Sequence, residues 1–131
     1  MKKYLFLLVF VLSTANAEYI KWYYNYDKGH QEAVKQHKSI MLFLKDDNAE
    51  SVKMFEETFS NRDIIKIVNK NYISIQLPYG TDQFPLELYY TLEPASLFFA
   101  TEYEILFGEK FTGHVNSAKL LKVLKQYQEL E

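Results

Sequence analysis

The sequence predicts an α/β domain in which helices cover both faces of a mixed β-sheet. Apolar runs alternate with segments of helical spacing along the first half, a pattern typical of parallel strands joined by crossover helices. Two later apolar runs are separated by residues 101–104, a connection short enough for an antiparallel hairpin. With 131 residues, 48% of them hydrophobic, the chain can bury the core of one domain. We therefore predict a three-layer α/β/α sandwich with parallel crossovers first and a C-terminal β-hairpin followed by a helix.

The first elements follow from the spacing of apolar residues. Residues 19–24 are aromatic and predict a short edge strand or an extended lead-in. Residues 27–37 predict a helix with Asp27 as its N-cap, because five residues recur on one face: Tyr26, His30, Ala33, Val34 and His37. Residues 39–44 predict a strand covered on both faces, since its apolar residues are consecutive.

Residues 41–59 predict a buried strand that runs directly into the N-terminus of a helix, a junction that often carries chemistry in α/β proteins. Three polar residues end the strand and can cap the helix: Asp46, Asp47 and Asn48. The core face of that helix is predicted to carry Val52, Phe55 and Phe59. A break is expected near Ser60, with a second helix starting at Asn61.

The second half supplies the remaining elements. Residues 72–77 predict a strand closed by Pro78 and Gly80, and residues 81–91 predict a short helix. The hairpin strands are predicted at residues 95–100 and 105–111. A last helix is expected after Gly113 and Asn116, with a core face formed by Leu120, Leu121, Leu124 and Tyr127.

Residues 1–17 predict a secretory signal peptide, so the domain itself spans residues 18–131. Lys2 and Lys3 form a positive start, residues 4–12 are nine consecutive apolar residues, and residues 15–17 (Ala-Asn-Ala) form a small-x-small cleavage site. Nine apolar residues are much shorter than the roughly 20 that a spanning helix needs, so no stable membrane insertion is expected after cleavage. The expected location is the periplasm, with extracellular release as the alternative.

Charge and cysteine content exclude several classes of function. Of the 15 basic and 17 acidic side chains, Lys2 and Lys3 belong to the N-terminal segment, which leaves the domain with a net charge of about −4. An acidic domain argues against nucleic acid or an anionic membrane as a partner. The chain has no cysteine, so it can form no disulfide, hold no thiolate-bound metal and perform no thiol exchange. We expect no cofactor and no metal.

The order of motifs resembles the exported proteins of the thioredoxin-like superfamily. The matching pieces are the apolar strand at 41–44, the Val-Lys-Met of 52–54, the Glu-Glu-Thr-Phe of 56–59, the Asn-Tyr-Ile of 71–73 and the Glu-Pro-Ala of 93–95. The resemblance covers nearly all of the expected domain. It implies that the two Cys-x-x-Cys positions fall on Ala49 and Val52. We therefore do not expect the family's redox chemistry in this chain.

The resemblance also implies a binding edge that does not depend on sulfur. In the family a cis-proline exposes the preceding backbone, which can pair with a bound polypeptide as an added strand. We predict a cis Glu93–Pro94 bond; the alternative is a proline that merely begins a strand. The candidate binding residues are Asn48, Ala49, Glu50, Ser51, Val52, Glu93, Pro94 and Ala95.

Other clusters have structural explanations. Asp46, Asp47 and Glu50 are expected to stabilise the positive end of a helix dipole rather than to bind a cation. His30 and His37 are two helical turns apart, too far for one metal ion, and are expected to be partly buried core side chains. The many aromatic residues fit either a core or an interface, in particular Tyr19, Trp22, Tyr23, Tyr24, Tyr26, Phe84, Tyr89 and Tyr90.

The favoured function is therefore a non-catalytic, exported thioredoxin-fold protein that binds a protein or peptide. One alternative is an enzyme without thiol chemistry that uses Asp46, Asp47 or Glu50 as an acid or base. Another is a structural subunit whose aromatic face is buried in a larger assembly.

Overall fold

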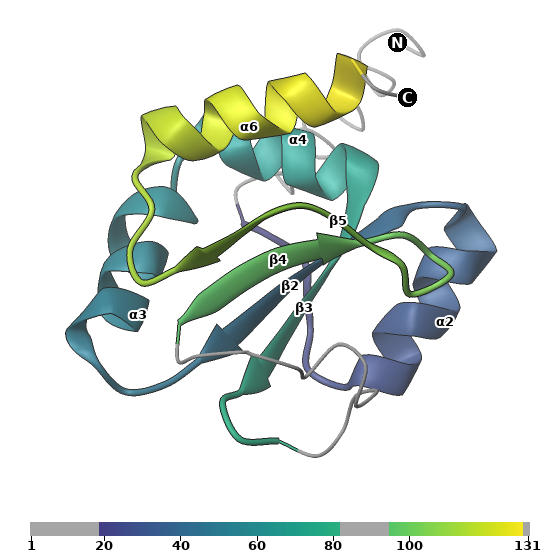
Figure 1. Cartoon of the computed structure of the whole chain (residues 1–131), viewed down its shortest axis with the longest axis horizontal. Helices are drawn as coiled ribbons and strands as arrows, with labels where there is room; N and C mark the ends of the chain where they lie inside the picture. The colour runs from purple at the N-terminus through teal and green to yellow at the C-terminus, as the bar shows by residue number, and fades with distance from the viewer. Residues whose placement is uncertain (1–18, 82–94, 130–131) are drawn as a thin grey trace, which may run out of the picture.

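The computed structural model describes residues 19–81 and 95–129, which form a five-stranded mixed sheet with helices on both faces (Figure 1). The strands lie in the order β1-β3-β2-β4-β5. β3 runs parallel to β1 and β2, whereas β4 is antiparallel to β2 and to β5. The bounds are β1 Trp22–Tyr23, β2 Ser39–Lys45, β3 Tyr72–Pro78, β4 Ser96–Ala100 and β5 Leu106–Thr112. The predicted sandwich, with its parallel crossovers and late hairpin, is confirmed.

Helices cover the sheet on both faces. Their bounds are α2 Tyr26–Gln36, α3 Ala49–Lys53, the π-helical turn η1 Met54–Thr58, α4 Arg62–Asn71 and α6 Ser117–Glu129. α2 packs on one face, whereas η1, α4 and α6 pack on the other, where α4 and α6 lie side by side (Figure 1). The predicted helix over residues 81–91 and the predicted cis Glu93–Pro94 bond lie outside the described residues.

β2 contributes to both cores because alternate residues of a strand point to opposite faces. Ile40, Leu42 and Leu44 pack in the core beneath α2, and Met41 and Phe43 pack in the core beneath α4 and α6. All five are at most 1% exposed. The prediction that this strand is covered on both faces is therefore confirmed.

The first helix begins one residue earlier than predicted. Asn25, not Asp27, is its N-cap: the Asn25 side chain accepts a hydrogen bond from the Lys28 N–H at 3.0 Å. Asp27 instead lies in the first turn, where the negative charge of an acidic side chain interacts favourably with the positive end of the helix dipole.

The predicted buried face of this helix is wrong at two positions. Val34 is 42% exposed, and the side chain of His37 is 80% exposed, so His37 is not a core histidine. Gly29 is buried instead, and a Cβ there would lie 2.5 Å from Ile75 Cδ1. The helix approaches β3 so closely at this glycine that its buried stripe is rotated away from Val34.

The helix after β2 also departs from the predicted spacing. Val52 was expected in the core, but it is 46% exposed, whereas Met54 and Thr58 are fully buried. The cause is η1, where the Phe59 N–H bonds to the Met54 carbonyl at 2.7 Å. This i→i+5 turn holds one residue more than an α-helical turn and shifts the inward-facing positions.

The predicted break near Ser60 is confirmed, since η1 ends at Thr58 and α4 starts at Arg62. Asn61 caps α4 by accepting hydrogen bonds from the N–H groups of Asp63 and Ile64 at 3.0 and 3.1 Å. Residues 59–61 therefore separate η1 from α4.

The hairpin carries an irregularity between Leu97 and Phe99, opposite Gly108. Gly108 has a φ of 72°, and a Cβ at this position would overlap the Tyr127 hydroxyl. That hydroxyl accepts a hydrogen bond from the Glu109 N–H at 2.7 Å. α6 thus fixes the bend of the edge strand β5 through one tyrosine.

The last helix follows the predicted pattern with one omission. The Asn116 side chain caps it by accepting a hydrogen bond from the Lys119 N–H at 2.8 Å. Leu120 and Leu124 are fully buried as predicted, and Val123, which the prediction left out, is also buried.

Candidate functional site

The junction between β2 and α3 is a turn closed by its own polar side chains. Asn48 caps α3 by accepting hydrogen bonds from the N–H groups of Glu50 and Ser51 at 3.1 and 3.2 Å. Asp46 in turn accepts hydrogen bonds from the Asn48 N–H and amide NH₂ at 3.1 and 2.7 Å. The capping interpretation is confirmed for Asn48, and Asp46 braces that cap.

Ser51 stabilises the turn through two hydrogen bonds to Asp46. Its side chain is fully buried, its hydroxyl donates to Asp46 Oδ1 at 2.8 Å, and its oxygen accepts from the Asp46 N–H at 3.2 Å. The carboxylate of Asp46 therefore forms its hydrogen bonds within the turn itself. Of the predicted binding residues here, Ser51 positions the turn, while Asn48, Ala49, Glu50 and Val52 are exposed.

Gly113 brings this turn next to Ala95. The Gly113 N–H donates to the Ala95 carbonyl at 3.1 Å. On the other side of Gly113, a Cβ would lie 2.6 Å from Glu50 Oε2, so the Glu50 carboxylate rests against the glycine backbone. Gly113 thus joins residues 48–52 to Ala95. Both were predicted to belong to the binding site, whereas Gly113 was not.

Ala95 itself is fully buried and has a φ of 59°. This left-handed conformation is uncommon for a residue with a side chain and costs about 1–2 kcal/mol. It bends the chain at the start of β4. Glu93 and Pro94 lie outside the described residues.

The three histidines make contacts with acidic side chains or backbone carbonyls. His30 Nε2 hydrogen-bonds to the Glu102 carbonyl at 2.8 Å, and His37 Nδ1 lies 3.2 Å from the Glu102 carboxylate. His114 Nε2 lies 3.2 Å from the Glu57 carboxylate. Within residues 19–81 and 95–129, no group of three or more His, Asp or Glu side chains is arranged to hold a metal ion.

Two surface pockets lie away from the junction turn. One is lined by aromatic residues beside β1, and the other lies around His37 and Glu102 at the end of the hairpin. Neither is lined by a residue from 46–52. The acidic residues of the junction therefore line neither concave site. In the part of the chain that the structure describes, no helix has both the length and the apolar character needed to cross a membrane.

The aromatic residues near the start divide between core and surface. Tyr26 is 2% exposed, and Trp22 and Tyr23 are half-buried. Tyr19 and Tyr24 are 77% and 67% exposed. Phe84, Tyr89 and Tyr90 lie outside the described residues.

Tyr26 is buried and hydrogen-bonds to the hairpin connection. Its hydroxyl donates to Glu104 Oε2 at 2.7 Å, and its ring stacks on His30 with a centroid distance of 5.8 Å. Burial first, and then the hydrogen bond to Glu104 together with the negative charges of Glu104 and Asp27, raise the pKa of Tyr26 above its ordinary value.

This shift predicts a loss of stability at alkaline pH. Above about pH 10 the unfolded chain releases the Tyr26 proton while the folded chain keeps it, so stability falls as pH rises. The slope that Tyr26 contributes is about 1.4 kcal/mol per pH unit. Urea titrations at several pH values between 8 and 11 should show that Tyr26→Phe, which has no proton to lose, is less stable than wild type at pH 8 but loses stability less steeply as pH rises. If the free energy of unfolding fell equally steeply with pH in the two proteins, the raised pKa of Tyr26 would be contradicted.

Comparison with known proteins gives the fold. No protein-family model and no curated protein matches the sequence. Among solved structures, the chain is similar to a thioredoxin from Thermus thermophilus at TM-score 0.68 and 15% identity, over 83% of this chain and 87% of that one. It is also similar to a DsbH oxidoreductase, at TM-score 0.63 and 16% identity, over 86% and 87% of the two chains.

A third solved structure is the reduced form of the C-terminal domain of Neisseria meningitidis DsbD. The TM-score is 0.61 and the identity 19%, over 76% of this chain and 91% of that domain. Two of these structures are an oxidoreductase and a protein in its reduced form, whereas this sequence contains no cysteine with which to undergo thiol redox chemistry. The chain therefore has a thioredoxin-like fold without a Cys-x-x-Cys site.

Proposed function

We propose that this chain is an exported thioredoxin-fold protein that binds a polypeptide without performing redox chemistry. The binding surface consists of the junction turn, defined as residues 48–52, together with residues 93–95. The observation that carries the proposal is the contact chain from Glu50 through Gly113 to Ala95, which brings Ala95 next to the junction turn.

The exposure of Val52 supports a docking role for the turn. An apolar side chain that is 46% exposed next to a charged residue offers contact area to a partner, and the turn behind it is already ordered by Asn48, Asp46 and Ser51. An ordered surface loses less conformational entropy on binding than a flexible one. The apolar segment and cleavage motif within residues 1–17 support export, with the periplasm as the proposed location.

Site-specific photo-crosslinking in a Gram-negative host that exports the chain tests this proposal. A benzoylphenylalanine at Val52 is expected to form discrete crosslinks to a polypeptide. The same group at Val34 is the matched control, because Val34 is 42% exposed and lies on α2, which packs on the opposite face of the sheet from η1. Equal crosslinks at both positions, or none at Val52, would refute docking at the junction turn.

A further inference from the structure

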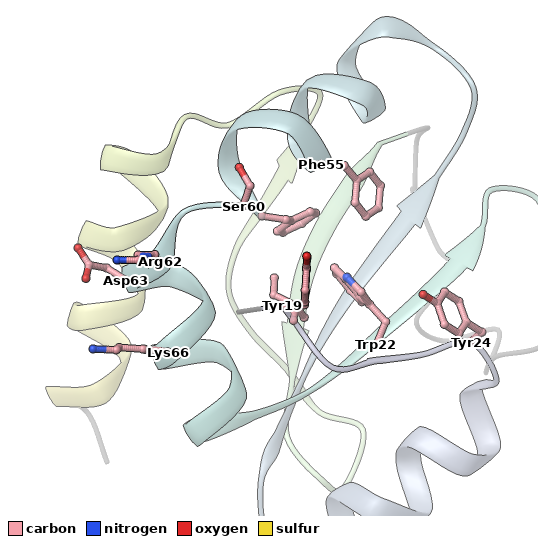
Figure 2. A pocket seen from close by; sticks show the side chains of 10 residues that line it. Tyr19, Trp22, Tyr24, Phe55, Ser60, Arg62, Asp63 and Lys66 are labelled. Carbon is pink, nitrogen blue, oxygen red and sulfur yellow. The ribbon is translucent and has the colours of Figure 1, made fainter. Parts of the chain in front are cut away.

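The described residues form a second candidate binding surface, a groove beside β1 with a volume of about 950 Å³ (Figure 2). We call it the β1 groove and define it by its lining residues: Tyr19, Ile20, Trp22, Tyr24, Phe55, Phe59, Ser60, Arg62, Asp63 and Lys66. None of these belongs to the junction turn or to residues 93–95. The groove therefore needs its own explanation.

The aromatic part of the groove is closely packed. In the extended segment at 20–24, alternate residues share a face, which places Ile20, Trp22 and Tyr24 together. The Trp22 ring packs against Phe59 at 5.1 Å and against Phe55 at 6.0 Å between ring centroids. Figure 2 shows Tyr19 and Trp22 on one side and Phe55 on the facing helix.

Asn69 fixes the segment that forms this wall. Its side chain donates to the Tyr19 carbonyl at 2.8 Å and accepts from the Lys21 N–H at 3.0 Å. One amide thus binds the backbone on both sides of Ile20, as a neighbouring strand would. These two hydrogen bonds fix the backbone of this wall without a ligand, which lowers the entropy cost of binding.

The exposed residues of the groove have the composition of a protein-binding surface. Among its lining residues, Tyr19 and Tyr24 are 77% and 67% exposed, and Trp22 and Arg62 line it too. Tryptophan, tyrosine and arginine are the residue types that carry most binding energy at protein interfaces. β1 is also one of the two edge strands among the described residues, and an edge strand can accept an added strand from another chain.

The charge of the groove indicates the chemistry of its ligand. Arg62 and Lys66 lie one turn apart on α4 at one side of the pocket, and Asp63 is the one acidic residue among the lining residues (Figure 2). Neither cation forms an ion pair with any residue in 19–81 or 95–129. The lining residues therefore carry a local excess of positive charge, although the net charge of the whole chain is −2. An acidic ligand would complement it.

We infer that the β1 groove binds an extended acidic polypeptide segment that carries an aromatic or large aliphatic side chain. The apolar side chain lies between Trp22 and the exposed tyrosines, and the acidic side chains meet Arg62 and Lys66. The inference does not depend on the proposed function of the junction turn.

Selection from a random heptapeptide library displayed on phage tests the inference with the purified protein as bait. The recovered peptides are expected to combine Asp or Glu with Phe, Trp, Tyr, Leu or Ile. Binding of the synthetic peptide is then measured by fluorescence, because Trp22 is the single tryptophan of the chain and lines the groove. A change in Trp22 emission that saturates with peptide is expected.

Matched variants separate the groove from the rest of the surface. Arg62→Glu combined with Lys66→Glu should weaken peptide binding about tenfold or more, whereas Lys122→Glu combined with Lys125→Glu, exposed cations outside the groove, should leave it unchanged. Tyr24→Ala should also weaken binding, and Tyr103→Ala, which removes a tyrosine that is 72% exposed elsewhere, should not.

Three results would overturn the inference: no recovered peptide, recovered peptides without acidic residues, or equal binding by the Arg62/Lys66 and Lys122/Lys125 variants. A dimer that dissociates on charge reversal at Arg62 and Lys66 would assign the groove to a second copy of the chain instead. Peptide binding at the groove and crosslinking at Val52 are separate measurements, so failure here and failure of docking at the junction turn are distinguishable.

Discussion

Replacement of Phe43 by alanine is expected to lower the free energy of unfolding by about 3–5 kcal/mol. Phe43 lies at the centre of β2, is fully buried, and packs edge-on against Phe55 and Phe59 at centroid distances of 5.5 and 5.2 Å. The variant loses both the burial of its ring and these two aromatic contacts. Domains of this size are stable by about 5–15 kcal/mol, so much of the total would be lost. Urea denaturation followed by circular dichroism measures the change.

Two further variants make this prediction specific. Phe43→Leu keeps most of the buried volume and should cost clearly less than Phe43→Ala. Tyr103→Ala removes a ring that is 72% exposed on the hairpin and should change stability by about 0.5 kcal/mol or less. A loss below about 1 kcal/mol for Phe43→Ala would show that the packing of Phe43 against Phe55 and Phe59 contributes little to stability.

Local sequence patterns were sufficient to predict most of the fold. The strands at 39–44 and 72–77 and the break near Ser60 follow from apolar runs and polar caps, which act between neighbouring residues. The hairpin follows from the short connection at 101–104. These features depend on no distant contact, so one sequence is enough to predict them.

The errors occur where distant contacts decide the geometry. Val52 was assigned to the core because an ideal α-helix would place it there, but η1 inserts one extra residue into the turn and Met54 is buried instead. Val34 is exposed because Gly29 allows α2 to approach Ile75 closely. Neither a π-helical turn nor a helix rotated by a close approach has a reliable sequence signal.

The candidate site shows the same division. The sequence indicates residues 48–52 through their position between a strand and a helix, and the resemblance to the thioredoxin-like proteins implies Ala95, next to the family's proline. The role of Gly113 was missed, because a glycine before a helix predicts a turn and says nothing of the carboxylate that packs on it. The β1 groove was also missed, since it joins residues 19–24 to residues 55–66 across the fold.

Adding cysteines at positions 49 and 52 is expected to create a thiol redox activity, for which the natural chain has no cysteine. Residues three apart on a helix have Cβ atoms about 5–6 Å apart, within reach of a strained or slightly adjusted disulfide. Position 49 is the first residue of α3, where the helix N-terminus favours a thiolate. Both positions are exposed, so a disulfide substrate can reach them.

The chemistry of the double variant Ala49→Cys, Val52→Cys is thiol–disulfide exchange. The thiolate at position 49 attacks a substrate disulfide and forms a mixed disulfide, and the thiol at position 52 then displaces the reduced substrate. Dithiothreitol supplies the electrons by reducing the resulting protein disulfide. The variant Ala49→Ser, Val52→Ser is the matched control, because it changes the same positions and adds no sulfur.

Reduction of insulin by dithiothreitol is the measurement that tests the central claim most directly. We predict that the natural chain and the double-serine control leave the rate at the uncatalysed background, whereas the double-cysteine variant raises it severalfold. Turnover by the natural chain would contradict the loss of redox chemistry. A double-cysteine variant that forms its disulfide but reduces insulin no faster than background would contradict the claim that this surface still accepts a polypeptide.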